Sequence, residues 1–436
     1  MHGLSRRRWL LWLALIPLVA TAANDSRTVA LQLLDRLDRG EYAEAVADFT
    51  PDMLKAVPAT QIQQIWASLP QQLGKPLRRG DATVTPANGM ELVMVPLYYE
   101  RGALTANIAV TPDGRIAGLR LLPLVPPPPA VPDEAGYTEQ DLQVGDQPSP
   151  LPATLVLPGG EGEHPAVVLV HGSGPQNRDE TIGPNHIFLE LARGLGKRGI
   201  AVLRYDKRTH VYPEQFKSGG FTMEEETVAD AVAAVDVLRQ QPRVDPSRVF
   251  VLGHSQGGML APRIAGRVDD LAGVVLFAAP ARSLLDLLPE QNRYLFGLDQ
   301  RISEDERAFL NQLDEQIAAL RGDGPVATAD TPMQLPAVYW RDADAVDPVA
   351  EAAAIEVPML LLQGGRDFQV TGTDWALWKD AFEGDPRATF RYYPALNHLG
   401  IAGQGASSLE EYQQPGHVEE QMITDIANWI DQVSGA

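Results

Sequence analysis

The chain has 436 residues, 44% of them hydrophobic and 21% charged, which is the composition of a folded globular protein with one large domain and a smaller one. Its 57 acidic and 36 basic residues give a formal net charge of −21, which argues against binding to nucleic acid or to an anionic membrane. It has no cysteine, which excludes disulfide bonds, a cysteine nucleophile and a cysteine-ligated metal ion.

Residues 1–22 have the pattern of a removable export signal. Three arginines at positions 6–8 precede an apolar run at 9–19, and small residues at 20 and 22 frame a cleavage site. Because the apolar run is too short to span a membrane, we expect cleavage, a periplasmic or secreted location and no stable membrane anchor. Residues 5–10 also resemble a twin-arginine signal, so the export route stays open.

Residues 25–122 predict a small α+β domain. Val29, Leu33 and Leu37 share one face of a helix that Gly40 ends. Further helical patterns lie at 42–49 and 61–69, and strand patterns lie at 90–99, 103–110 and 115–122. Residues 123–136 contain four consecutive prolines at 126–129 and predict a semi-rigid linker.

From residue 137 the pattern alternates between strands and helices. Continuous apolar runs lie at 153–157, 166–170, 200–203, 249–252, 273–278 and 358–362. Such runs, separated by helices, indicate an α/β domain over 137–436 with a parallel sheet covered on both faces. Residues 282–350 have helical periodicity and no strand pattern, so we expect a helical cap over the carboxyl edge of the sheet, where ligands bind.

Ser255 is the strongest candidate for a catalytic residue. It lies in Gly253-His254-Ser255-Gln256-Gly257, directly after the apolar end of a predicted strand. A Gly-x-Ser-x-Gly sequence at a strand-to-helix turn exposes the serine hydroxyl above the sheet. A serine hydroxyl is a poor nucleophile until a neighbouring base takes its proton, and an imidazole is the usual base.

His398 and Asp367 are the candidates for the base and for the acid that orients it. His398 follows the strand pattern at 389–393, and Asp367 follows the apolar run at 358–362. Alone, either could be an ordinary surface or turn residue, and Asp374 is the second candidate for the acid. The order Ser255, Asp367, His398 is the order of the catalytic triad in α/β-hydrolases.

Four segments make residues 137–433 resemble an α/β-hydrolase: His171-Gly172-Ser173-Gly174, Gly253–Gly258, Gly364–Asp367 and Asn397-His398. The resemblance implies that the backbone N–H groups of Gln256 and Ser173 form the oxyanion hole. Residues 25–122 resemble the small α+β domain that precedes the hydrolase in some exported bacterial esterases, although no motif residue supports this.

Other conspicuous residues rank lower. We interpret His254 as a packing residue and the charged segment 204–208 as a structural strand end. Tyr339 and Trp340 could line an acyl pocket or pack in the core or the lid, and the sequence does not decide between these. The sequence has no zinc-binding His-Glu-x-x-His motif, no Walker motif and no dinucleotide fingerprint, so it implies neither a metal ion nor a cofactor.

The expected function is that of a serine carboxylesterase, which hydrolyses small to medium acyl esters through an acyl-enzyme. The same triad also serves serine peptidases or amidases and thioesterases, so these stay open. The N-terminal hundred residues lack the repeats of the propeller that oligopeptidases carry, which disfavours a peptidase. A non-catalytic binding protein is the alternative of another class, and the intact triad residues argue against it. The oligomeric state stays open.

Overall fold

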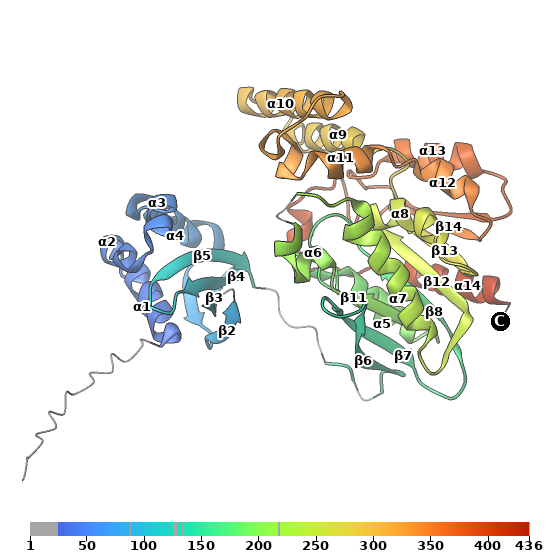
Figure 1. Cartoon of the computed structure of the whole chain (residues 1–436), viewed down its shortest axis with the longest axis horizontal. Helices are drawn as coiled ribbons and strands as arrows, with labels where there is room; N and C mark the ends of the chain where they lie inside the picture. Colours follow the sequence, from blue (N-terminus) through green and yellow to red (C-terminus); the bar gives the residue numbers. More distant parts are fainter. Residues whose placement is uncertain (1–24, 88, 125–129, 133, 217–218, 436) are drawn as a thin grey trace, which may run out of the picture. The chain divides into compact units, whose positions relative to one another are not determined.

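The computed structural model describes residues 25–87, 89–124, 130–132, 134–216 and 219–435. The chain divides into two compact units, Met1–Pro126 and Pro127–Ala436, and this division falls within the predicted linker (Figure 1). The predicted export signal and the four-proline run lie outside the described residues. No helix among the described residues has the length and apolar character needed to cross a membrane.

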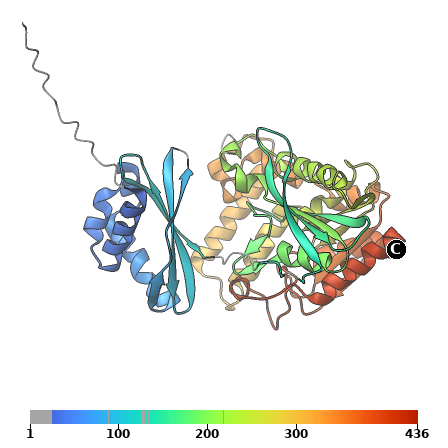
Figure 2. The ribbon, with the colours of Figure 1, turned by 90° about the horizontal axis from the view of Figure 1, so that it is seen from below.

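In the N-terminal unit, helices cover one face of an antiparallel sheet (Figure 2). Val93, Val95 and Leu97 are buried while their neighbours are less so, because successive side chains of a strand point to opposite faces. The helices are α1 (Ser26–Asp38), α2 (Tyr42–Ala45), η1 (Val46–Asp48), α3 (Pro51–Ala56) and α4 (Ala59–Leu73). The strands are β1 (Pro76–Arg79), β2 (Thr83–Ala87), β3 (Met90–Tyr99), β4 (Gly102–Val110) and β5 (Ile116–Pro123).

The second unit is built on an eight-stranded, mainly parallel sheet, which confirms the predicted fold class. The strand order is β15-β14-β13-β12-β8-β11-β7-β6, and only β7 and β6 join it in antiparallel pairs. Every apolar run predicted as a strand coincides with one, and three of the runs extend one residue beyond it. The strands are β6 (Tyr137–Val144), β7 (Leu151–Pro158), β8 (His164–Val170), β11 (Ala201–Tyr205), β12 (Val244–His254), β13 (Gly273–Phe277), β14 (Met359–Gly364) and β15 (Ala388–Tyr393).

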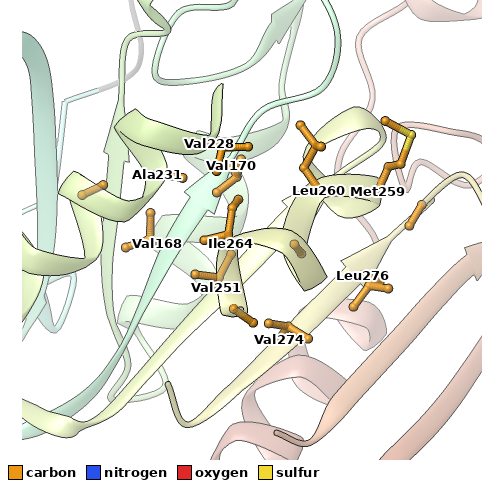
Figure 3. Packing of buried hydrophobic residues seen from close by; sticks show 14 of the residues in the cluster. Val168, Val170, Val228, Ala231, Val251, Met259, Leu260, Ile264, Val274 and Leu276 are labelled. Carbon is orange, nitrogen blue, oxygen red and sulfur yellow. The ribbon is translucent and has the colours of Figure 1, made fainter. Parts of the chain in front are cut away.

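Helices cover both faces of this sheet. In β8, Val167 and Leu169 face the cluster that contains α5 and α14, whereas Val168 and Val170 face α7 and α8. Figure 2 shows α14 and α7 on opposite sides of the sheet, and Figure 3 shows α8 packed on it through Met259, Leu260 and Ile264. These elements are α5 (Ile187–Gly196), α6 (Arg208–Val211), η2 (Pro213–Phe216), the π-helical η3 (Glu224–Val228), α7 (Ala229–Arg239), α8 (Gln256–Ala265), α13 (Gly372–Phe382) and α14 (Glu420–Ser434). A short hairpin, β9 (Thr181–Ile182) and β10 (Asn185–His186), precedes α5, and η6 (Glu411–Gln413) precedes α14.

The segment between β13 and β14 is helical and contains no strand in residues 282–350, as predicted. It comprises α9 (Leu284–Phe296), α10 (Glu304–Arg321), η4 (Thr328–Asp330), η5 (Pro332–Gln334), α11 (Ala337–Asp344) and α12 (Pro348–Ala354). Figure 1 shows α9, α10 and α11 together at one end of this unit, whereas α12 packs against α8. The cap therefore comprises residues 284–344, and α12 belongs to the helical layer on the sheet.

Candidate active site

Ser255 sits at a strained turn between β12 and α8. Its φ of 54° and ψ of −119° lie where side chains are disfavoured. A Cβ atom on Gly253 would lie 2.1 Å from the Gly257 carbonyl oxygen, and one on Gly257 would lie 2.2 Å from the Val170 oxygen. Only glycine fits at these two positions. The Ser255 N–H donates to the Phe277 oxygen at 2.9 Å, which ties the turn to β13.

The structure brings His398 and Asp367 into contact. Nδ1 of His398 lies 2.8 Å from Oδ2 of Asp367, and both side chains are buried. The other carboxylate oxygen of Asp367 accepts hydrogen bonds from the N–H groups of Gln369 and Val370, at 2.8 and 3.0 Å, so the carboxylate is fixed. Asp374, the second candidate for the acid, instead pairs with Arg282 at 2.7 Å.

Ser255 and His398 line one cavity of about 230 Å³, and Ser173 lies on its wall. The Ser255 hydroxyl makes no hydrogen bond to any described residue, and neither does Nε2 of His398. The backbone N–H groups of Ser173 and Gln256 likewise donate to no oxygen atom of the described residues. Free N–H donors beside a free hydroxyl and an oriented imidazole can stabilise the oxyanion of an acyl transfer.

His254 makes hydrogen bonds in addition to its packing on Phe277, so the packing interpretation was incomplete. Its Nδ1 lies 3.0 Å from Oε2 of Glu180, and its Nε2 lies 2.9 Å from the backbone oxygen of His398. Burial opposes protonation of this ring most strongly, but the Glu180 carboxylate, the His398 backbone oxygen and Asp367 together outweigh it and raise the pKa of His254. Oε1 of Glu180 accepts the Gly172 N–H at 2.7 Å. This buried pair therefore joins the loop of His398 to the loop of Ser173.

Sequence reasoning also missed Lys207, which is 2% exposed and lies just beyond β11. The segment 204–208 was interpreted as structural, but Lys207 contacts both segments that carry the predicted oxyanion donors. A lysine two residues after the end of a buried strand, at the same sheet edge as Ser255, was the available signal.

Trp340 and Tyr339 of α11 satisfy both interpretations offered for them. Trp340 is buried, donates its indole N–H to the Pro332 oxygen at 3.0 Å and lines the cavity of Ser255. Both residues line a neighbouring cavity of about 590 Å³. The described residues contain no group of three or more His, Asp or Glu side chains that could hold a metal ion.

Comparison with known proteins places this chain in a family. Residues 163–401 match the family described as serine aminopeptidase, S33, and residues 30–119 match a family of unknown function. The chain is 37% identical over 394 residues to Esterase EstD of Thermotoga maritima, covering 89% of this chain and 92% of that protein. It is 24% identical over 299 residues to the uncharacterized peptidase YuxL of Bacillus subtilis, covering 66% of this chain and 36% of that protein.

Solved structures of lower identity also match. The Pyrococcus furiosus esterase Pf2001 has 16% identity and a TM-score of 0.44, covering 71% of this chain and 96% of that one. Est1E from Butyrivibrio proteoclasticus has 16% identity and a TM-score of 0.45, covering 68% of this chain and 99% of that one. From the family match and the identity to EstD, the chain belongs to the serine aminopeptidase S33 family and is an α/β-hydrolase serine esterase.

Proposed function

We propose that this esterase hydrolyses small to medium-sized carboxylic esters through an acyl-enzyme on Ser255. The proposal rests on one observation above all: the Asp367-bonded ring of His398 and the free hydroxyl of Ser255 line the same small cavity. Gln256 and Ser173 supply the backbone N–H groups of the oxyanion hole.

In the acylation step, Oγ of Ser255 attacks the ester carbonyl carbon while Nε2 of His398 takes the hydroxyl proton. Asp367 accepts the Nδ1–H of the ring and stabilises its positive charge. The carbonyl oxygen becomes an oxyanion and receives the N–H groups of Gln256 and Ser173. When the tetrahedral intermediate collapses, the bond to the alcohol oxygen breaks and His398 gives its proton to the leaving alcohol.

Water completes the cycle. His398 takes a proton from a water molecule, which attacks the acyl carbon of the Ser255 ester. The same oxyanion hole stabilises the second tetrahedral intermediate. The second collapse releases the carboxylic acid and returns the proton to Ser255. These steps need no metal ion or cofactor, because every proton moves between His398, Ser255, the alcohol and water.

The size of the substrate follows from the cavity. At about 230 Å³ it is smaller than the ~300–1,000 Å³ of pockets that hold drug-sized ligands. Leu284, Leu287 and Leu288 of α9 supply apolar lining, which suits an aliphatic group. Ser173 and Trp340 also line the neighbouring 590 Å³ cavity, which adds space for a medium-sized group.

A series of p-nitrophenyl esters from acetate to palmitate, with an aminoacyl p-nitroanilide for comparison, tests the proposal. We expect kcat/KM to peak at short to medium chains and to be at least about a hundredfold lower for the anilide, since amides are harder to cleave. A peak at palmitate would contradict the size argument, and faster anilide cleavage would make the protein a peptidase.

We also propose that the enzyme acts in the periplasm or outside the cell, without a stable membrane anchor. The proposal rests on the basic, apolar and small-residue pattern of residues 1–22. Cell fractionation and N-terminal sequencing of the mature protein test it, and an intact N-terminus in the cytoplasm would contradict it.

A further inference from the structure

Lys207 is a buried cation that two hydrogen bonds and one ion pair hold in place. Its Nζ lies 3.0 Å from the Gly172 backbone oxygen, 3.2 Å from Oε1 of Gln256 and 3.1 Å from Oε1 of Glu226. Lys207 and Glu226 are 2% and 4% exposed, and Gln256 is fully buried. A buried charge is retained only when partners satisfy it, so this arrangement is built around Lys207.

The same polar cluster reaches the cap. The Gln256 side-chain amide donates to the Tyr339 hydroxyl at 2.8 Å, and that hydroxyl lies 3.0 Å from Oε2 of Glu226. Tyr339 belongs to α11 of the cap, and Glu226 lies on the π-helical segment η3. π-Helical turns are often found at functional sites.

The contact with Gly172 matters because of the geometry of the peptide bond. The Gly172 C=O and the Ser173 N–H belong to one peptide unit, and in a trans peptide they point in opposite directions. An oxygen held by buried Lys207 therefore turns the N–H away from the interior, toward the cavity that Ser173 lines. A cationic donor on the oxygen also polarises the unit and makes its N–H a stronger donor.

We propose that Lys207 is a positioning residue for the oxyanion hole, where it orients and polarises the 172–173 peptide and fixes Gln256 through its side chain. The inference rests on the proposed function of Ser173 and Gln256 as oxyanion donors. Glu180 accepts the Gly172 N–H, and Lys207 donates to the Gly172 oxygen, so buried groups of opposite charge bind both backbone polar groups of this residue. Through Gln256 and Tyr339, the oxyanion hole and the cap share one hydrogen-bond network.

The test is the pair K207M/E226Q, which removes both charges and so leaves no unpaired buried carboxylate. Removal of a whole oxyanion donor lowers kcat about 10²–10³-fold, and here both N–H groups remain, so we expect a loss of about 10–100-fold. KM for a short p-nitrophenyl ester should change less than about threefold. The affinity for a trifluoromethyl ketone, which forms a tetrahedral oxyanion adduct, should fall by the same factor as kcat.

The matched control is R204M/D179N. It removes another buried ion pair, joined at 2.9 Å, from the end of the same strand, and kcat should stay within about threefold of wild type. A folded K207M/E226Q variant with unchanged kcat, or with unchanged affinity for the ketone, would overturn the inference. If that variant does not fold, K207Q/E226Q is measured in the same way. It also removes both charges but keeps a neutral amide with two N–H donors at position 207, and the expected loss in kcat is about 3–10-fold. Failure of the proposed function would instead appear as wild-type protein without ester turnover.

Discussion

The two sides of the cavity that Ser255 and His398 line are built differently. The strand-end side consists of Ser255, Asp367, His398 and the loop 171–174, each placed directly after or close to the end of a parallel strand. The cap side consists of side chains from α9, η5 and α11, including Leu287, Met333 and Trp340. The first side is fixed by main-chain hydrogen bonds and buried ion pairs. The second side is mainly apolar, and it includes both buried residues, such as Leu287 and Trp340, and Met333, which is 66% exposed.

The difference indicates that the two sides of the cavity have different tasks. Acyl transfer needs donors and protons held to within a fraction of an ångström, and a buried parallel sheet supplies that rigidity. Substrate selection needs only an apolar wall of suitable size, which helices outside the sheet can supply and change. Changes on the strand-end side should therefore affect kcat or folding, and changes to the apolar lining of the cap side should affect the choice of ester.

The largest effect is expected for S255A. Loss of the nucleophile should lower kcat about 10⁶-fold and abolish labelling of the Ser255 peptide by a fluorophosphonate. Mass spectrometry of the labelled protein and turnover of a p-nitrophenyl ester measure both. S247A, at an exposed serine on the same strand, should retain full activity and labelling. Labelling at another serine with surviving turnover would refute the assignment.

Two carboxylates near the site should respond in opposite ways. D367N should lower kcat about 10⁴-fold, because the His398 ring loses the acceptor that fixes its tautomer. D374N should change kcat less than about threefold but lower the free energy of unfolding by about 2 kcal/mol, because Asp374 pairs with Arg282. Kinetics and urea unfolding of both variants test this. The reverse result would make Asp374 the catalytic acid.

The strand-end side should also lose stability in acid through His171. Burial lowers the pKa of His171 to about 4, while the unfolded chain titrates at an ordinary histidine pKa of 6.5. The unfolded state therefore binds the proton first, and stability is lost as the pH falls from about 6.5 to about 4. At about 1.4 kcal/mol per pH unit this amounts to about 3 kcal/mol.

Urea unfolding of wild type and H171Q at pH 7 and pH 4 isolates this contribution, because all other titrating groups are shared. We expect wild type to lose about 3 kcal/mol more than the variant over this range. Equal losses would mean that His171 is not held in its neutral form.

The smallest effect is expected on the cap side. Met333 has a φ of 52° and lines both cavities, so M333G enlarges the space without straining the backbone. The ratio of kcat/KM for octanoate to that for butyrate should rise about tenfold. Q300G, at another positive φ in an exposed part of the cap, is the control and should leave the ratio unchanged. An unchanged ratio in M333G would remove the cap from the determinants of chain length.

Much of the second unit was predictable because buried parallel strands are continuous apolar runs. The edge strand β6 lacks that signature, because it is largely polar and partly exposed, and it was missed. In the N-terminal unit, the short strands β1 and β2 and the short helix α3 were missed for a different reason. Each is too short to produce a clear periodicity.

At the active site, residues at strand ends could be placed in advance because the carboxyl ends of parallel strands meet at one edge. The buried groups behind them could not. Glu180 and His254 are 74 residues apart, and Lys207 reaches Gln256 across 49 residues, so their pairing depends on tertiary packing. In addition, the local sequence around a charged residue does not show whether that residue is exposed or buried.

The backbone of Ser255 has a consequence for evolution. A φ of 54° disfavours every side chain there by about 1–3 kcal/mol, whereas glycine adopts it freely. If Ser255 is the nucleophile, as proposed, S255G should raise the resistance to heat and abolish hydrolysis. Selection for turnover and selection for thermal resistance therefore act in opposite directions at this residue, and the serine persists only while the chemistry is useful.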